Sequence, residues 1–262
     1  MKYWLALWGW AARWLAHIWV LKYLEDQKIE ISEISWASMW SIIAVLYASW
    51  MSMDELEQVA AELKLYKLLD FDIKTGLLKW KKVEKFLRDR LWDLDFSDLK
   101  IPVKIVATCL ETGKKEVFKS GNVITAMRAS MGLPGILSPL QIWDHHYIDG
   151  WVSCNLPIEI LEASNIIAVS ALKDISGVFE KRKKFWNFEL PKSVFSMNYD
   201  VIHRTVIIMM DQNETSSKNT PWKKVIYMRP DFWDLDYYSF DKSPEMIALG
   251  YSEAKKQLKF SK

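Results

Sequence analysis

The sequence predicts a three-layer α/β/α fold with a central, mostly parallel sheet. Stretches of strand type alternate with stretches of helical length, which is the pattern of a sheet covered by helices. Residues 102–111 (PVKIVATCLE) form a near-continuous apolar run, typical of a strand buried on both faces. The chain has 262 residues, 50% of them hydrophobic, and contains no internal repeat or low-complexity linker. We therefore expect residues 1–262 to form a single domain.

The first half of the chain shows clear signals for strands and helices. Strands are predicted at residues 3–7 and 29–35, and helices at residues 15–24, 39–49, 53–65 and 82–91. Ser52 and Glu55 have the spacing of a capping box at the start of the third of these helices. The apolar strand at 102–111 turns back into a short partner strand that ends near residue 119.

The second half of the chain continues the same alternation, with weaker signals after residue 173. The predicted elements are a helix at 122–130, a strand at 141–148, a helix at 157–163, a strand at 166–172, a long helix at about 192–211, a strand at 225–229 and a terminal helix from about 243.

Composition excludes several classes of function. The 35 basic and 33 acidic residues give a net charge of +2, without the basic stripe that a nucleic-acid partner requires. Cys109 and Cys154 make neither a disulfide framework nor a metal-ligand spacing. We expect free thiols in a reducing compartment, which favours the cytoplasm, and no metal site.

The apolar stretch at residues 3–24 has the length of a membrane span. Arg13 and His17 lie in its middle, and an arginine at mid-membrane costs ~2.5–3.5 kcal/mol. The charge and cleavage pattern of a signal peptide is missing as well. We expect this stretch to be part of the globular fold.

Tryptophan is in excess where glycine is short. The chain has 15 Trp and 9 Gly, whereas an average composition would give roughly 18 glycines. If glycine is written for tryptophan, residues 5–17 read LALGGGAARGLAH, residues 34–41 read ISGASMGS and residues 148–152 read IDGGV.

In that form the chain resembles the patatin-like phospholipase family, in particular its compact bacterial members. The resemblance runs from about residue 3 to residue 172. Further segments that carry it are residues 76–79 (GLLK), 98–103 (DLKIPV), 128–135 (RASMGLPG) and 155–157 (NLP). It implies an α/β/α sandwich and hydrolysis of lipid acyl esters through a covalent acyl-enzyme, without a metal or cofactor.

The resemblance implies a two-residue catalytic unit without histidine. Ser38 would be the nucleophile, at the tip of a strand-to-helix turn where small residues must stand two positions before and after it. Asp149, followed by Gly150, would be its base.

The resemblance also implies an oxyanion hole after the first strand. A glycine-rich loop beside a helix N-terminus can aim backbone N–H groups at a developing oxyanion. Gly9, Trp10 and Ala11 occupy that loop, and Arg13 would support its charge.

Tryptophan stands at six positions where these motifs call for glycine. They are Trp8, Trp10, Trp14, Trp36, Trp40 and Trp151, and Ala11 replaces a further loop glycine. At ~1–3 kcal/mol of backbone strain per site, the sum of ~6–18 kcal/mol would match the whole stability of a domain.

The replacement is not confined to the motifs. Trp50, Trp80, Trp92 and Trp143 stand where related sequences would carry a turn glycine, whereas Trp186, Trp222 and Trp233 give no indication. We hypothesise that the codon UGA, which some bacterial lineages read as glycine, has been translated here as tryptophan.

Four other interpretations stay open. The first loop, with its glycines, also resembles a G-x-G-x-x-G dinucleotide fingerprint, but the second strand lacks the acidic residue that would hold a ribose. A Ser–His–Asp triad could use His145 or His146, which we expect to face solvent, whereas His17 should be a packed or capping residue. If the tryptophans are genuine, the chain is a catalytically dead relative or a Trp-rich protein of membrane interfaces.

The expected partner is a lipid or another acyl-ester substrate, with transient contact to a membrane surface left open. Residues 179–195, with a basic run and aromatic side chains, are expected to be an ordinary surface segment rather than a membrane-contacting flap. Acyl transfer to an acceptor other than water also remains open, because the same acyl-enzyme serves both outcomes.

Overall fold

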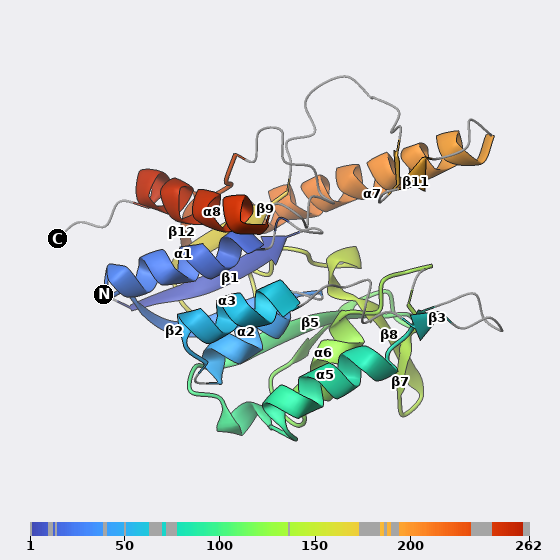
Figure 1. Ribbon diagram of the computed structural model, residues 1–262, viewed down its shortest axis with the longest axis horizontal. Coiled ribbons are helices and arrows are strands. Elements are labelled where there is room, and N and C mark those ends of the chain that lie inside the picture. Colours follow the sequence, from blue (N-terminus) through green and yellow to red (C-terminus); the bar gives the residue numbers. More distant parts are fainter. Residues whose placement is uncertain are drawn as a thin grey trace.

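A computed structural model gives the three-layer α/β/α fold that the sequence predicts (Figure 1). The structure describes residues 2–9, 13, 15–38, 41–49, 51–62, 70–71, 78–135, 137–172, 184–185, 188–189, 194–231 and 243–258. The stretch at 179–195, considered above as a flap, lies mostly outside these residues.

The central sheet has eight strands, five of which are parallel to one another. The strand order is β12-β9-β1-β2-β5-β8-β7, and β6 also pairs with β5. The parallel strands are β1 (Lys2–Gly9), β2 (Glu30–Ala37), β5 (Val103–Cys109), β9 (Asn165–Ala171) and β12 (Lys224–Met228). The antiparallel strands are β6 (Lys115–Phe118), β7 (Leu140–Ile142) and β8 (His145–Asp149). Two small hairpins, β3 (Asp70–Phe71) with β4 (Leu78–Lys79) and β10 (Lys184–Phe185) with β11 (Phe188–Glu189), lie apart from this sheet.

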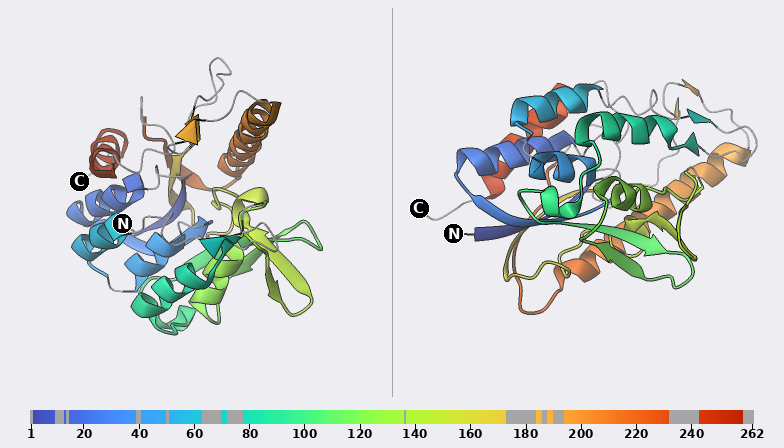
Figure 2. Two further views of the ribbon diagram at one scale, coloured as in Figure 1. Left: turned by 45° about the vertical axis from the view of Figure 1, so that its right-hand side comes forward. Right: turned by 90° about the horizontal axis from the view of Figure 1, so that it is seen from below.

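Helices cover both faces of the sheet (Figure 2). On one face lie α1 (Leu15–Asp26), α2 (Ser41–Ala48), α3 (Met53–Glu62), α5 (Lys81–Leu91), α6 (Val123–Ser130) and α8 (Ser243–Gln257). The other face is covered by α7 (Val194–Lys218) and by the chain that follows β8. Two short 3-10 helices complete the elements, η2 (Phe96–Asp98) and η3 (Gly150–Val152).

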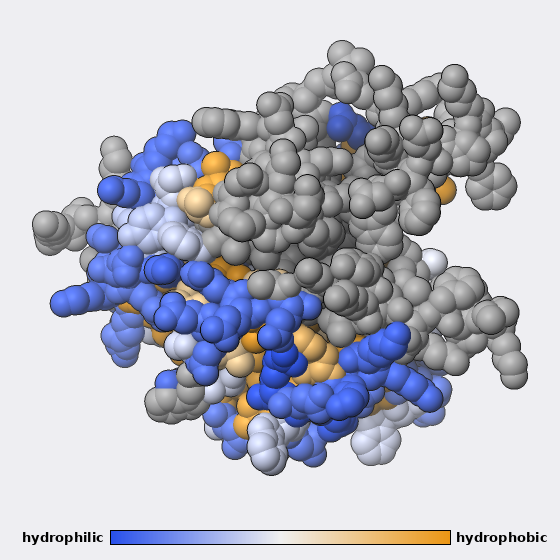
Figure 3. Space-filling view, viewed as in Figure 1, coloured by the Kyte–Doolittle hydropathy of each residue, from blue (hydrophilic) through white to orange (hydrophobic). Residues whose placement is uncertain are grey.

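The alternation of side chains along β1 builds a core on each face of the sheet. Leu5 and Leu7 are buried among the helices of the first face, while Ala6 and Trp8 are buried on the α7 side. All residues of β5 are buried, as its apolar run predicts. The outer sides of the helices carry mainly hydrophilic side chains, with apolar ones in a strip between α3 and α5 (Figure 3).

The ends of β2 and β8 meet on one edge of β5. Strand β6 pairs along Ile105–Thr108, a stretch that overlaps the partners of both β2 and β8. β2 and β8 must therefore share the other edge of β5, one after the other. The last residue of β2, Ala37, pairs with Val106. The last residue of β8, Asp149, pairs with the next residue, Ala107.

Most predicted elements are confirmed within one to three residues, although α7 continues seven residues beyond its predicted end. The capping box of α3 is present, because Ser52 N donates to Glu55 Oε2 at 2.8 Å and Glu55 N to Ser52 Oγ at 3.3 Å. The stretch at 3–24 forms β1 and α1. None of the helices in the described part of the chain combines the length and the apolar character needed to cross a membrane.

The helix predicted at 157–163 is wrong. This segment forms turns, and its apolar side chains Ile158 and Leu161 are buried against the sheet. Lys223 donates to the carbonyl oxygens of Ile158, Glu159 and Leu161, so these acceptors are satisfied from outside the segment.

The strand predicted at 141–148 is a hairpin instead. β7 and β8 pair around a turn at Trp143 and Asp144, with Ile142 opposite His145. The end of the segment at Asp149 is nonetheless where the sequence places it.

Three tryptophans stand in backbone conformations that favour glycine. Trp92, Trp143 and Trp222 have φ of 53°, 56° and 69° and are 81%, 89% and 95% exposed. A side chain in this region costs roughly 1–2 kcal/mol, and an exposed indole gains no burial that could offset it. The expectation of a turn glycine is thus supported at Trp92 and Trp143 and extends to Trp222. At Trp80 the φ of −91° suits any residue, and Trp50 lies outside the described residues.

Replacing Trp92, Trp143 or Trp222 by glycine should raise the free energy of unfolding by about 1 kcal/mol per site, because glycine adopts positive φ without a Cβ clash. Chemical denaturation of each single variant measures this. The matched control is alanine at the same site, which removes the indole but keeps Cβ and should recover less of the stability. Equal gains for glycine and alanine would show that backbone strain is not the cause.

Candidate active site

Ser38 stands at the turn between β2 and α2, in a strained conformation. Its φ of 73° is in the left-handed region, which a non-glycine residue occupies at a cost. Helix α2 begins at Ser41, and Ser41 N donates to Ser38 O at 3.0 Å. A strained strand-to-helix turn that presents a serine is the geometry of a nucleophile elbow.

Asp149 accepts a hydrogen bond from Ser38. The distance between Ser38 Oγ and Asp149 Oδ2 is 2.6 Å, across 111 positions of the sequence. Trp151 N donates to the second carboxylate oxygen, Asp149 Oδ1, at 3.2 Å. The carboxylate is therefore held from two sides, with one oxygen on the serine hydroxyl.

Burial raises the pKa of Asp149 from its ordinary value of 3.8 to about 7. Hydrogen bonds from Ser38, Trp151 N and Gly150 N oppose this shift by stabilising the carboxylate. Asp149 is 1% exposed and Ser38 7% exposed. A carboxylate with a pKa near neutrality, in contact with a serine hydroxyl, is suited to general-base catalysis.

Gly150 permits no side chain. A Cβ at this position would lie 2.1 Å from Val106 O, closer than real Cβ contacts allow, and would also be tight against Ala37 Cβ at 3.1 Å. This close approach exists because Asp149 and Ala37 end their strands next to each other on β5. It explains physically why glycine follows the aspartate.

Ser130 supports the serine turn, a role that the sequence alone did not reveal. Ser38 N donates to Ser130 Oγ at 2.8 Å, and Ser130 Oγ donates to Val106 O at 2.6 Å. The buried hydroxyl at the end of α6 thus ties the strained turn to the central strand. Its segment, RASMGLPG, was part of the resemblance, but nothing in the local pattern distinguished Ser130 from a core serine.

Gly9 lies at the same end of the sheet as Ser38, and Arg13 follows it by four positions. Gly9 ends β1 and pairs with Ala171, while β2, which leads to Ser38, is the neighbour of β1 on its other side. Arg13 is 1% exposed. Trp10 and Ala11 of the predicted oxyanion loop lie outside the described residues, as do Trp14 and Trp40.

The motif tryptophans that the structure describes are all buried. Trp8 and Trp36 are 0% exposed and Trp151 is 5% exposed. Within the described part of the chain, the indole N–H groups of Trp8 and Trp36 meet no acceptor. A buried donor without a partner costs about 1–3 kcal/mol, so tryptophan fits these positions poorly.

His17, His145 and His146 do not form a triad with Ser38 and Asp149. His17 is fully buried, donates from Nε2 to Trp8 O at 2.9 Å and packs edge-on against Trp36. Burial lowers its pKa to about 4, which keeps the ring neutral. His146 Nδ1 lies 2.8 Å from Glu111 Oε1 in the exposed hairpin, where His145 faces solvent. These positions agree with the expectations for all three.

The described residues offer no metal cluster. No three side chains of His, Cys, Asp or Glu gather there to ligate an ion. A cavity of about 330 Å³ lies at the start of β5, lined by Glu33, Lys104 and Glu162 among others. Lys104 is paired with both glutamates, at 2.9 and 3.0 Å, so its charge is neutralised within the cavity wall.

Similar proteins were found among curated sequences and solved structures. An uncharacterised NTE family protein of Mycobacterium bovis is 32% identical over 173 residues, which cover 63% of this chain and 48% of the relative. A neuropathy target esterase of Drosophila melanogaster is 24% identical over 270 residues, covering 94% of this chain and 19% of the relative. A lysophospholipase of Kluyveromyces lactis is 26% identical over 275 residues, covering 95% of this chain and 18% of the relative. The chain thus spans about half the length of the mycobacterial relative or less than a fifth of the longer ones.

The crystal structure of VipD from Legionella pneumophila shares the fold. The TM-score is 0.62 at 13% identity, over 98% of this chain and 66% of that one. Residues 5–162, more than half of the chain, match the model of the patatin-like phospholipase family. The chain therefore belongs to the patatin-like phospholipase family.

Proposed function

We propose that this protein hydrolyses acyl esters of lipids with Ser38 as nucleophile and Asp149 as general base. The observation that carries the proposal is the 2.6 Å hydrogen bond from Ser38 Oγ to the buried carboxylate of Asp149, at the tip of a strained turn. Membership of the patatin-like phospholipase family supports a lipid ester as the substrate.

The chemistry follows from the pair. Ser38 Oγ attacks the ester carbonyl while its proton passes to Asp149, and the protonated carboxyl then gives that proton to the leaving alcohol. Water hydrolyses the acyl-serine in the second half, with Asp149 again taking the proton and Ser38 recovering it as the fatty acid leaves. The N–H groups of the loop after Gly9, with Arg13 nearby, are proposed to stabilise the oxyanion in both halves.

A phospholipid or lysophospholipid is the proposed substrate. The similar protein of Kluyveromyces lactis is named a lysophospholipase, and that of Drosophila melanogaster a neuropathy target esterase. We propose hydrolysis over acyl transfer for the same reason. We further propose a cytoplasmic location, supported by the two unbridged cysteines, Cys109 and Cys154.

We propose that residues 1–262 form one domain. β9 and β12 lie beyond the residues that match the family model, yet both belong to the central sheet. β9 pairs with β1 through Gly9, directly beside the proposed oxyanion loop.

We also propose that glycine occupies the motif positions 8, 10, 14, 36, 40 and 151 in the protein that the cell makes. Two kinds of tryptophan support this: Trp8 and Trp36 are buried with unpartnered indole N–H groups, and Trp92, Trp143 and Trp222 are exposed at positive φ. A membrane-interface protein would carry its indoles on one face of a helix. These five tryptophans do not lie together in that way.

Removing either partner of the pair should abolish hydrolysis. In a background with glycine at the six motif positions, Ser38→Ala and Asp149→Ala should each lower kcat/KM for lysophosphatidylcholine by roughly 10³-fold or more, because nucleophile and base act as a unit. Fatty-acid release measures this, and circular dichroism checks the fold. The exposed residues Ser97 and Asp144 provide matched alanine controls. Full activity in Ser38→Ala would overturn the assignment.

Activity should fall as the pH drops below about 7. Asp149 must be ionised to accept the proton of Ser38, and burial raises its pKa to about 7. The profile of kcat/KM should therefore rise with pH and level off above that value, since it reports the base of the free enzyme. Steady-state kinetics from pH 5 to 9 on a soluble short-chain ester measures this. A midpoint near 4 would contradict the burial argument.

The glycine proposal predicts the mass of the native protein. Peptides that contain positions 8, 36 and 151, isolated from the source cells, should carry glycine by mass spectrometry, and the codons there should be UGA. The glycine form should also unfold at a higher temperature than the tryptophan form, since it removes buried unpaired donors. Native peptides with tryptophan would instead identify a catalytically dead relative.

A further inference from the structure

Helix α7 reaches the candidate site from outside the part of the chain that matches the family model. The match ends at residue 162, and α7 begins at Val194. Ile207 and Met210 of α7 are buried in the same apolar cluster as Trp151, which lies two residues after Asp149. The helix thus packs against the turn that follows the proposed base.

Asn213 of α7 bonds directly to this turn. Its Nδ2 lies 3.3 Å from Trp151 O and 3.3 Å from Val152 O, and the two hydrogens of the amide can serve both carbonyls. Trp151 N in turn donates to Asp149 Oδ1. All these contacts on η3 are made by its main chain, so they do not depend on whether residue 151 is tryptophan or glycine.

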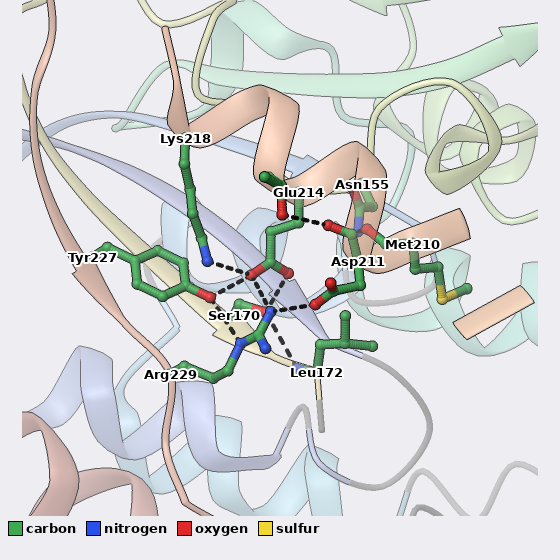
Figure 4. Close-up of polar contacts among 10 residues, drawn as sticks. Asn155, Ser170, Leu172, Met210, Asp211, Glu214, Lys218, Tyr227 and Arg229 are labelled. Carbon is green, nitrogen blue, oxygen red and sulfur yellow. Dashed lines mark hydrogen bonds and ion pairs between the residues drawn. The ribbon is translucent and has the colours of Figure 1, made fainter. Parts of the chain in front are cut away.

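The next residue, Glu214, anchors α7 to the sheet (Figure 4). Its carboxylate is fully buried and accepts from Ser170 Oγ at 2.6 Å and from Arg229 at 2.6 Å. Tyr227 OH also donates to it, and Lys218 pairs with it at 3.2 Å. Because a buried carboxylate with several donors is held rigidly, this turn of α7 is fixed against β9 and β12.

A second amide ties the same turn of α7 to the segment after the base. Asn155 is fully buried and donates from Nδ2 to Met210 O at 2.8 Å. Asn155 and Asn213 therefore bond across the same interface in opposite directions. The turn at 150–152 is held on one side by β5, through the contact of Gly150 with Val106, and on the other by α7.

We propose that Asn213 is a positioning residue for Asp149. Its carboxamide fixes the carbonyls of residues 151 and 152, so that the N–H group of residue 151 points at the carboxylate, and Glu214 holds Asn213 in place. The inference rests on the proposed role of Asp149 as base. It gives α7, which the family match does not include, a role in positioning the base.

The test replaces Asn213 in the glycine background by leucine, which has a similar size but no donor and no charge. Asn213→Leu should lower kcat about 10-fold and change KM less than about twofold. The substitution displaces the base, whereas the binding of the substrate is unaffected. The midpoint of the kcat/KM profile should move to higher pH, since the bond from the N–H of residue 151 lowers the pKa of Asp149. The other groups that act on this carboxyl are Ser38 and Gly150 N, with no charged side chain among them.

Two further variants separate positioning from folding. Asn213→Gln keeps the donor and should recover most of kcat and the original midpoint, while Gln212→Ala, at the exposed neighbour on α7, should leave both unchanged. The midpoint does not depend on how much enzyme is folded, so it remains informative if Asn213→Leu is less stable. An unchanged midpoint and kcat in Asn213→Leu would overturn the proposal. Absence of Ser38-dependent hydrolysis in the unmutated glycine form and in Gln212→Ala would instead overturn the proposed function, and this inference with it.

Discussion

The candidate site depends on the meeting of two strand ends on one edge of β5. Ala37 and Asp149 pair with consecutive residues of that strand, so the parallel strand β2 and the antiparallel strand β8 point at each other. Ser38 follows one end directly, and its hydroxyl has the carboxylate of Asp149 within 2.6 Å. The lack of space for a side chain at Gly150 and the tie from Ser130 to Val106 are both consequences of packing this junction closely.

The same junction imposes an electrostatic cost. Asp149 is buried, and its pKa in the fold, about 7, lies above the 3.8 of an unfolded aspartate. Below about pH 4 the carboxyl is protonated in both states and no cost arises. As the pH rises toward 7 the unfolded state loses the proton first, so stability falls, and above 7 the full cost remains, with an upper bound on the order of 4 kcal/mol. A buried carboxyl that titrates near neutrality is thus obtained at the expense of stability.

The tryptophans conflict with the structure in two distinct physical ways. At Trp8 and Trp36 the fold buries an indole and leaves its N–H without an acceptor among the described residues. At Trp92, Trp143 and Trp222 it exposes the indole and bends the main chain into the left-handed region. Glycine removes both conflicts, because it has neither a side chain to bury nor a Cβ to clash. Overpacking would not explain the conflict at the exposed tryptophans. Backbone strain in turns would not explain the conflict at the buried ones.

Local patterns in the sequence determined the elements and their order. The apolar run of β5 and the capping box of Ser52 and Glu55 depend on neighbouring residues only, and both are confirmed. The sequence also marked Ser38 and Asp149, through a resemblance to a family that becomes visible when glycine replaces tryptophan. Only the tertiary structure decided that residues 157–163 are not helical, that Ser130 bonds to the turn of Ser38, and that Asn213 bonds to the turn after Asp149. Their partners lie 92 and about 60 positions away, and no periodicity within a segment records a contact that the packing of distant strands and helices creates.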